Sequence, residues 1–247
     1  MQAVSLSPSP TLRVVQDAEA AGELVALQIF ESAQKAVAET GRFTLAIPGG
    51  SSPRAVFEKL SSPKYLNEFP WSKTHVLWVD ERAVPADHKD SNAGVFIREV
   101  FTDLPFVPEQ VHRMLGELGP EHGALAYQET LRSVLNPEGG DENTIDFALL
   151  GIGEDGHIAS LFPGDPALDS TGTVIPIYNS PKPPPERITL TMPVLKSAKR
   201  IIMLVLGQGK AEAVARSFAG EPLPAQIVAD ETNTLWIIDQ AAASKLS

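Results

Sequence analysis

The residues best suited to chemistry lie in one stretch of the chain, IDFALLGIGEDGHIASLFPG at residues 145–164. Its first six residues are apolar apart from Asp146, which is typical of a buried strand. Three glycines then allow the main chain to pass close to a ligand. His157 follows them directly, and its unperturbed pKa lies near neutrality. Because open α/β sheets place their sites at the ends of buried strands, this pattern predicts a catalytic histidine on a glycine loop.

Two other interpretations of this loop are possible. Residues 151–156 fit the GxGxxG dinucleotide fingerprint, which requires a long helix after the turn and an acid about 20 residues further on. The sequence FPGDP at residues 162–166 would end any helix almost at once, which argues against a dinucleotide site. A purely structural turn that carries a chance histidine remains an alternative.

A second candidate is the peptide LAIPGGSSPR at residues 45–54, whose pattern predicts a strand, a glycine turn and a helix start. Ser51 or Ser52 can cap that helix. Free amides and the helix dipole at such a start can bind a phosphate, and Arg54 lies close in sequence. The alternative is an ordinary turn between a strand and a helix that binds no ligand. The Gly-Lys-Ser/Thr sequence of a nucleotide P-loop is missing, which excludes an ATP site. The residues predicted to contact phosphate are Gly49, Gly50 and Ser51.

Charged residues also follow the apolar run at residues 75–79, in the sequence DER at residues 80–82. Residues at the carboxyl ends of parallel strands commonly form binding sites, although Glu81 and Arg82 could equally be solvated loop charges. Further along, the sequence DSN at residues 90–92 can cap a following helix, so Asn92 has a structural explanation as well.

The net charge of −11 argues against nucleic acid or an anionic membrane as a partner. An anionic substrate would therefore need a few local cations, and Arg82, Arg187 and Lys210 could supply them.

With no cysteine, disulfides and thiolate sites are excluded. No metal-binding histidine motif occurs, so we expect no metal and no cofactor. The histidines interpreted as structural or surface residues are His75, His88, His112 and His122.

These residues require a scaffold of strands that alternate with helices. Strands are predicted at residues 12–15, 43–47, 75–79, 145–150, 201–206 and 235–238. A first helix is predicted to follow a cap at Asp17 and to run to about Glu39, and further helices are predicted at residues 53–60, 93–100, 121–135 and 210–218. This alternation predicts an α/β fold with a mostly parallel sheet covered on both faces, in a single domain spanning residues 1–247. The proline-rich residues 179–185 are interpreted as a loop. The first ten residues lack the features of a secretory signal and no apolar run could span a bilayer, so we expect a cytoplasmic protein.

Taken in order, these segments resemble the 6-phosphogluconolactonase family. The resemblance rests on IPGGS at residues 47–51, WVDER at 78–82, SN at 91–92, GIGEDGHIASLFP at 151–163, RITLT at 187–191 and GQGKA at 207–211. It implies a Rossmann-like three-layer α/β/α sandwich of the kind found in glucosamine-6-phosphate deaminase and ribose-5-phosphate isomerase. It also implies metal-free hydrolysis of a small sugar-phosphate lactone.

On this basis His157 is the expected general base. The predicted catalytic set is His157, Arg82 and Asp155. The predicted substrate-binding set is Gly49, Gly50, Ser51, Asp80, Asn92, Gly156, Arg187 and Lys210. A monomer or a homodimer is expected.

Two other functions compete with the lactonase. Glucosamine-6-phosphate deaminases have a similar histidine segment, but tyrosine replaces Arg82 and Asn-Glu-Pro replaces the sequence SLFP at residues 160–163. Leu161 and Phe162 cannot supply the acid–base groups that ring opening and deamination need. A non-catalytic sugar-phosphate sensor would need a DNA-binding or other output domain. Residues 1–10, which precede the first predicted strand, are too few for one, so we do not expect a sensor.

Overall fold

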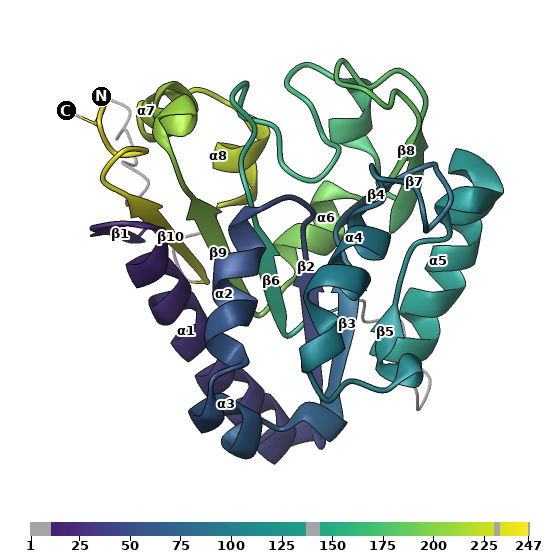
Figure 1. Cartoon of the computed structure of the whole chain (residues 1–247). Helices are drawn as coiled ribbons and strands as arrows, with labels where there is room; N and C mark the ends of the chain where they lie inside the picture. The colour runs from purple at the N-terminus through teal and green to yellow at the C-terminus, as the bar shows by residue number, and fades with distance from the viewer. Residues whose placement is uncertain (1–10, 137–143, 230–232, 247) are drawn as a thin grey trace, which may run out of the picture.

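The computed structural model describes residues 11–136, 144–229 and 233–246. Seven strands form its central sheet in the order β1-β10-β9-β6-β2-β3-β5, and every neighbouring pair is parallel (Figure 1). The strands are β1 (Thr11–Val15), β2 (Phe43–Ile47), β3 (Thr74–Trp78), β5 (Val111–His112), β6 (Phe147–Leu150), β9 (Arg200–Val205) and β10 (Thr234–Asp239).

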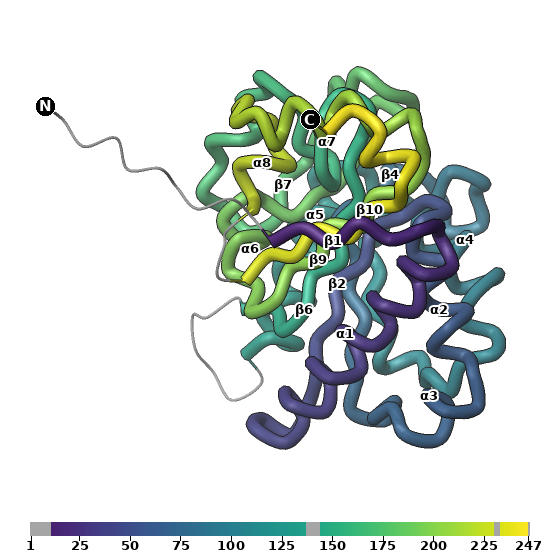
Figure 2. Tube along the Cα trace, turned by 90° about the vertical axis from the view of Figure 1, so that its left-hand side faces the viewer, coloured from purple at the N-terminus to yellow at the C-terminus, as the bar shows by residue number. Residues whose placement is uncertain are grey.

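Helices cover both faces of this sheet, as the edge-on view in Figure 2 shows. One face packs against α1 (Ala18–Thr40), α2 (Ser52–Leu60), α3 (Pro63–Glu68) and α4 (Asn92–Glu99). The other packs against α5 (Gly119–Leu135), α6 (Met192–Lys196), α7 (Ala211–Phe218) and α8 (Pro224–Val228). The predicted three-layer α/β/α sandwich is confirmed. Short 3-10 helices link the elements: η1 (Trp71–Lys73), η2 (Phe101–Asp103), η3 (Pro108–Gln110), η4 (Gly116–Leu118), η5 (Pro166–Asp169) and η6 (Gln208–Lys210).

Each central strand is apolar because its side chains contribute to two hydrophobic cores, one on each face of the sheet. Successive strand residues point to opposite faces of a sheet. Leu149 of β6 accordingly belongs to the hydrophobic cluster that includes residues of α1 and α2, whereas Leu150 belongs to the cluster that includes residues of α6 and α8. Sheets buried on both faces have near-continuous apolar strands, which is why the strands could be recognised from the sequence.

The first helix shows how local sequence determines an element. The Asp17 side chain accepts a hydrogen bond from Ala20 N at 2.9 Å and so caps α1 as predicted. Gly41 ends the helix in a left-handed conformation, with φ of 79°. The predicted cap of α2 is wrong, because Ser51 precedes the helix but makes no side-chain capping hydrogen bond.

A second, antiparallel sheet was not predicted. It consists of β4 (Asp80–Arg82), β8 (Arg187–Leu190) and β7 (Val174–Ile177), in that order. The charged β4 lacks the apolar pattern of a strand, and its partner β8 lies about a hundred residues away along the chain. Glu81 is buried in this arrangement, so its interpretation as a solvated loop charge is wrong.

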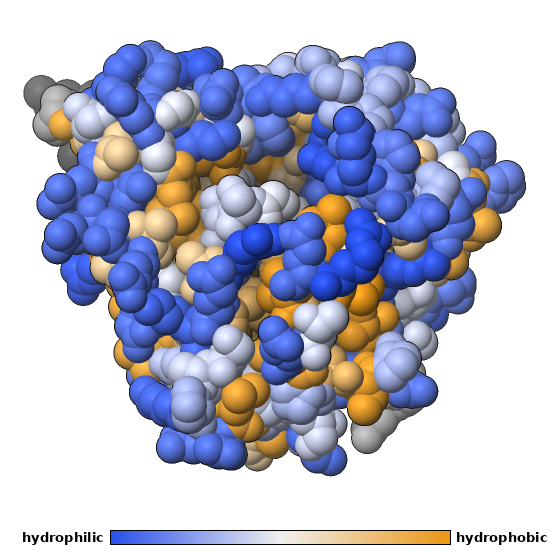
Figure 3. Space-filling view, in the orientation of Figure 1, coloured by the Kyte–Doolittle hydropathy of each residue, from blue (hydrophilic) through white to orange (hydrophobic). Residues whose placement is uncertain are grey.

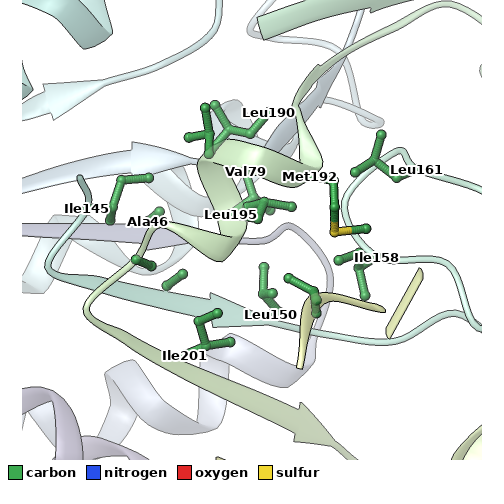
Figure 4. Packing of buried hydrophobic residues seen from close by; sticks show 14 of the residues in the cluster. Ala46, Val79, Ile145, Leu150, Ile158, Leu161, Leu190, Met192, Leu195 and Ile201 are labelled. Carbon is green, nitrogen blue, oxygen red and sulfur yellow. The ribbon is translucent and has the colours of Figure 1, made fainter. Parts of the chain in front are cut away.

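The histidine loop is fixed to the core by its own apolar residues. Ile158 and Leu161 are fully buried, and they lie in the same hydrophobic cluster as Leu150 and Met192 (Figure 4). Burial of such side chains contributes roughly 1.5–3 kcal/mol each. The core therefore holds the chain that follows His157.

Candidate active site

A cavity of about 300 Å³ lies where the loops after four strands meet. Its walls come from the segments that follow β2, β3, β6 and β9, which share one edge because the strands are parallel. In Figure 3 the face shown in Figure 1 is hollowed in its upper half, with hydrophilic residues around much of the rim. Nine predicted site residues line the cavity: Gly49, Gly50, Ser51, Asp80, Arg82, Asn92, His157, Arg187 and Lys210. The other two, Asp155 and Gly156, do not line it.

Asp155 orients the histidine from behind. His157 Nδ1 lies 2.6 Å from Asp155 Oδ1. A carboxylate only accepts hydrogen bonds, so Nδ1 carries the proton and Nε2 is left as the basic nitrogen. Burial lowers the pKa of His157, and the hydrogen bond with Asp155 only partly opposes this effect. The imidazole is therefore neutral near pH 7, as a general base must be.

Two glycines give the histidine loop its shape. Gly153 N donates to the carbonyl of His157 at 2.8 Å, and Gly156 N donates to the carbonyl of Gly153 at 3.0 Å. Gly156 has a φ of 90°, which side chains rarely adopt. A Cβ on Gly153 would overlap Nδ1 of His157. Glycine at position 153 therefore makes room for the imidazole, and Gly156 serves the turn rather than the cavity wall.

Asp80 and Asn92 are joined in the cavity wall. Asn92 Nδ2 donates to the backbone carbonyl of Asp80 at 3.0 Å and to Oδ1 of the same residue at 3.2 Å. Ser160 Oγ donates to Asp80 Oδ2 at 2.6 Å. Gly49 packs against the Asn92 amide, where a Cβ would overlap it. The buried Asp80 carboxylate thus links the glycine turn, the start of α4 and the loop after His157.

Glu81 attaches α4 to the second sheet. Its carboxylate accepts hydrogen bonds from the amides of Asn92 at 2.6 Å and Ala93 at 2.8 Å, and from Ser91 Oγ at 3.1 Å. Burial raises the pKa of Glu81, and these backbone bonds oppose the shift. Ser91 caps α4 by accepting from Gly94 N at 2.9 Å. The prediction of a cap at residues 90–92 is confirmed, and Asn92 is the first residue of the helix.

The predicted cations differ in how far their donors are already used. Arg82 Nη1 donates to the carbonyl of Asp90 at 2.8 Å, while its buried Nε has no partner among the described residues. Burial lowers the pKa of Lys210, which lines the cavity from η6. Arg54 pairs instead with Glu99, both about half exposed, and does not line the cavity. Its sequence proximity to the glycine turn was therefore misleading.

Two side chains near His157 had no predicted role. The ring of Phe162 lies 4.6 Å from that of His157, centroid to centroid. Lys182, on the proline-rich loop, has its Nζ 3.6 Å from Asp155 Oδ1. The lysine within a run of prolines was the only sequence signal for it, and we interpreted that run merely as a loop.

Among the residues with described positions, no group of three or more His, Cys, Asp or Glu side chains could hold a metal ion. Within the same part of the chain, no helix is long and apolar enough to cross a membrane.

Comparison with known proteins gives a consistent result. The family described as glucosamine-6-phosphate isomerases/6-phosphogluconolactonase matches residues 16–236. The 6-phosphogluconolactonase of Mycobacterium tuberculosis is 40% identical over 220 residues, which cover 85% of this chain and 88% of that protein. The probable 6-phosphogluconolactonase 3, chloroplastic, of Oryza sativa subsp. indica is 40% identical over 226 residues, or 86% of this chain and 69% of that protein.

A solved structure agrees with these relatives. The crystal structure of 6-phosphogluconolactonase from Thermotoga maritima superimposes with a TM-score of 0.81 at 27% identity, and the match covers 94% of this chain and 100% of that one. The chain belongs to the glucosamine-6-phosphate isomerase/6-phosphogluconolactonase family.

Proposed function

We propose that the protein hydrolyses 6-phospho-D-glucono-1,5-lactone to 6-phospho-D-gluconate, the lactonase step of the oxidative pentose phosphate pathway. One observation carries the proposal. His157, with a basic Nε2, lines the same cavity as the start of α2 and the cations Arg82 and Lys210. A base and an anion site within one small cavity fit a substrate that joins a hydrolysable carbonyl to a phosphate.

The proposed reaction needs one proton carrier. Nε2 of His157 takes a proton from water as the water oxygen bonds to the lactone carbonyl carbon. The tetrahedral oxyanion is stabilised by amides of the glycine loop or by a cation of the cavity wall. When the bond to the ring oxygen breaks, the imidazolium returns its proton to that oxygen. The products are the carboxylic acid and a free hydroxyl, and the base is regenerated.

The start of α2 is the proposed phosphate site. Pro53 has no amide N–H, and Arg54 N already donates to the carbonyl of Ser51 at 3.1 Å. The amides of Gly50, Ser51 and Ser52 are therefore the proposed backbone donors, and the helix dipole favours an anion beside them. Gly50 has a φ of 88°, which turns the chain from β2 into this helix. The phosphate oxygens can also accept from Arg82, Lys210 or the remaining donor of Arg187.

The deaminase alternative lacks the groups that its chemistry requires. Residues 158–163 follow the histidine and contain no carboxylate or amide side chain. Leu161 and Phe162 are buried, so they supply packing rather than proton transfer. Arg82 also takes the place of the deaminase tyrosine. These residues favour the lactonase.

A coupled assay tests the proposal. Purified protein is given freshly generated phosphogluconolactone, and release of 6-phosphogluconate is followed with a dehydrogenase after spontaneous hydrolysis is subtracted. We expect enzymatic turnover, and none with glucosamine 6-phosphate. Turnover of glucosamine 6-phosphate alone would favour the deaminase, and binding of either compound without turnover would favour a sensor.

We further propose that residues 1–247 act as one cytoplasmic domain, as a monomer or homodimer and without a cofactor, metal ion or nucleic acid. The proposal of metal-free hydrolysis is consistent with the described residues, in which no group of three or more His, Cys, Asp or Glu side chains could hold a metal ion. The rice relative is named a chloroplast protein, so the compartment needs its own test, by fractionation of the source cells.

A further inference from the structure

Arg187 stands apart from the other cavity cations because the protein already uses most of its donors. The side chain is buried, and Nε donates to the carbonyl of Pro184 at 3.0 Å. Nη2 donates to the carbonyls of Lys182 at 2.9 Å and Pro183 at 3.3 Å, and Nη1 donates to Ser160 Oγ at 3.3 Å. Nη1 also lies 3.9 Å from Asp80 Oδ2, so the buried charge is paired as well. A guanidinium has five N–H groups, and these hydrogen bonds engage four of them.

These bonds supplement the few hydrogen bonds that the proline-rich loop makes within itself. Residues 181–185 read PKPPP, and prolines have no N–H with which to pair the carbonyls of their neighbours. Ser180 closes the loop by donating from N to the Pro185 carbonyl at 3.0 Å and from Oγ to the Lys182 carbonyl at 2.9 Å. Arg187 satisfies three successive carbonyls at the centre of the loop. Its guanidinium therefore determines where this segment lies.

The loop places Lys182 beside the hydrogen-bonded pair of Asp155 and His157. Lys182 Nζ lies 3.6 Å from Asp155 Oδ1, the same oxygen that lies 2.6 Å from His157 Nδ1. Arg187 also lies over the Phe162 ring, 5.8 Å from its centroid, and that ring packs against His157. One buried guanidinium thus contacts both segments that surround the imidazole.

We propose that Arg187 and Lys182 are positioning residues: Arg187 clamps the proline-rich loop, and the clamped loop holds the Lys182 ammonium against the carboxylate oxygen that orients His157. The catalytic meaning of this arrangement rests on the proposed lactonase function, but the arrangement itself can be tested in the free protein. The ammonium competes with the imidazole for one carboxylate oxygen, and it opposes a second positive charge nearby.

The charges around His157 come from several elements. Asp155 lies on its own loop, Asp80 on β4 and Lys182 on the proline-rich loop, with Arg187 and Lys210 further along the cavity wall. Burial lowers the pKa of His157 most, Asp155 and Asp80 raise it, and Lys182 lowers it. Removing the ammonium should therefore raise the pH at which the imidazole becomes charged.

The decisive experiment is an NMR titration of the His157 ring in the free protein, with the resonance assigned by its loss in His157→Gln. We expect Lys182→Met to move the titration to higher pH. Arg187→Lys keeps the charge but loses the planar fork, so it should release the loop and move the titration the same way. The double variant should show no shift beyond that of Lys182→Met. Lys64→Met, which removes an exposed lysine of α3, is the control.

Each other outcome is informative. An unmoved titration in Lys182→Met would overturn the role of the ammonium, and additive shifts in the double variant would overturn the clamp. If Arg187→Lys does not fold, Ser180→Ala loosens the same loop by removing the donor to the Lys182 carbonyl, and should give the same shift.

Activity provides a second readout. In Arg187→Lys, misplacement of the imidazole by about 1 Å should lower kcat roughly 10–100-fold. In Lys182→Met, the acid limb of kcat/KM should move to higher pH in parallel with the titration. A lysine that only bound substrate would raise KM and leave the free-protein titration unchanged. If the wild-type protein hydrolysed no lactone, the proposed function would fail while the titration still decided this inference.

Discussion

The imidazole of His157 depends on three neighbouring residues, each of which acts on it in a different way. Asp155 fixes its tautomer, Gly153 leaves the volume that its ring occupies, and Phe162 packs against its face. Burial makes the charged form of His157 unfavourable, so the side chain is a base at the pH where most enzymes work.

Replacement of His157 tests its role as base. His157→Gln should lower kcat by roughly 10²–10⁴-fold with little change in KM, since a positioned acid–base group contributes about that much. Because burial lowers the pKa of His157, the acid limb of kcat/KM for the wild type should lie below about pH 6.5, the usual value. The exposed His122→Gln is the matched control. Near-normal turnover in His157→Gln would remove this residue from the mechanism.

Replacement of Gly153 tests the room beside the ring. In Gly153→Ala the new Cβ would overlap His157 Nδ1, so the imidazole must move. We expect kcat to fall roughly 10–100-fold, the usual effect of misplacing a catalytic group by about 1 Å. Gly172→Ala has an added Cβ in ordinary contact and should behave as wild type. Equal kinetics in the two variants would show that the loop adapts without cost.

At the scale of secondary structure, the carboxyl ends of the strands determine where the cavity residues lie. Parallel β2, β3, β6 and β9 deliver their following loops to one edge, and the small second sheet carries Asp80, Arg82 and Arg187 to the same place. The strands also pair histidines away from the cavity. His75 Nδ1 on β3 lies 3.0 Å from His112 Nε2 on β5, with the rings stacked at 5.2 Å.

This histidine pair makes stability depend on pH. Burial lowers the pKa of His112 to about 4, with His75 adding to the shift, and burial also lowers the pKa of His75. The unfolded chain, with ordinary histidine pKa values near 6.5, therefore binds more protons below pH 6.5 than the folded chain does. The free energy of unfolding should fall as pH decreases from about 6.5 toward 4.

Urea titrations at several pH values measure this dependence. The midpoint should fall less steeply between pH 6.5 and pH 4.5 in His112→Gln than in the wild type, because one titrating group is gone. His122→Gln removes an exposed histidine and should keep the wild-type slope. If His112→Gln also kept that slope, the pair would not contribute to acid unfolding.

For the whole molecule, the contrast is between a net charge of −11 and a cavity whose lining, among the described residues, includes Arg82, Arg187 and Lys210 but only one carboxylate, Asp80. An anionic substrate is repelled by the surface at long range but is bound by oriented donors at short range. Recognition of phosphate must therefore come from a few groups inside the cavity, which makes it sensitive to single substitutions.

Substrate discrimination measures this recognition. Phosphogluconolactone should be hydrolysed with a kcat/KM at least about 100-fold above that of unphosphorylated gluconolactone, since charge-assisted hydrogen bonds contribute roughly 1.5–3 kcal/mol each. Arg82→Met or Lys210→Met should reduce the ratio, whereas Lys64→Met should not. Equal kcat/KM for the two lactones would mean that the cavity has no phosphate site.

Much of this protein follows from local sequence. Hydrophobic periodicity located the long helices and the central strands, since each of these elements buries its own apolar side chains. The Asp17 cap and the role of the glycines around His157 could be predicted from the sequence because they depend on neighbours only a few residues away. Nine of the eleven predicted site residues line one cavity because parallel strands bring their carboxyl ends together.

Tertiary structure decided what depends on distant partners. The strand β4 exists only because residues about a hundred positions away pair with it, and that pairing buries Glu81. Arg54 and Arg187 are both arginines close to predicted site segments, yet one pairs with Glu99 outside the cavity and the other holds a buried loop. A charged side chain takes its role from whichever partner the fold brings within hydrogen-bonding distance, and local sequence does not record that partner.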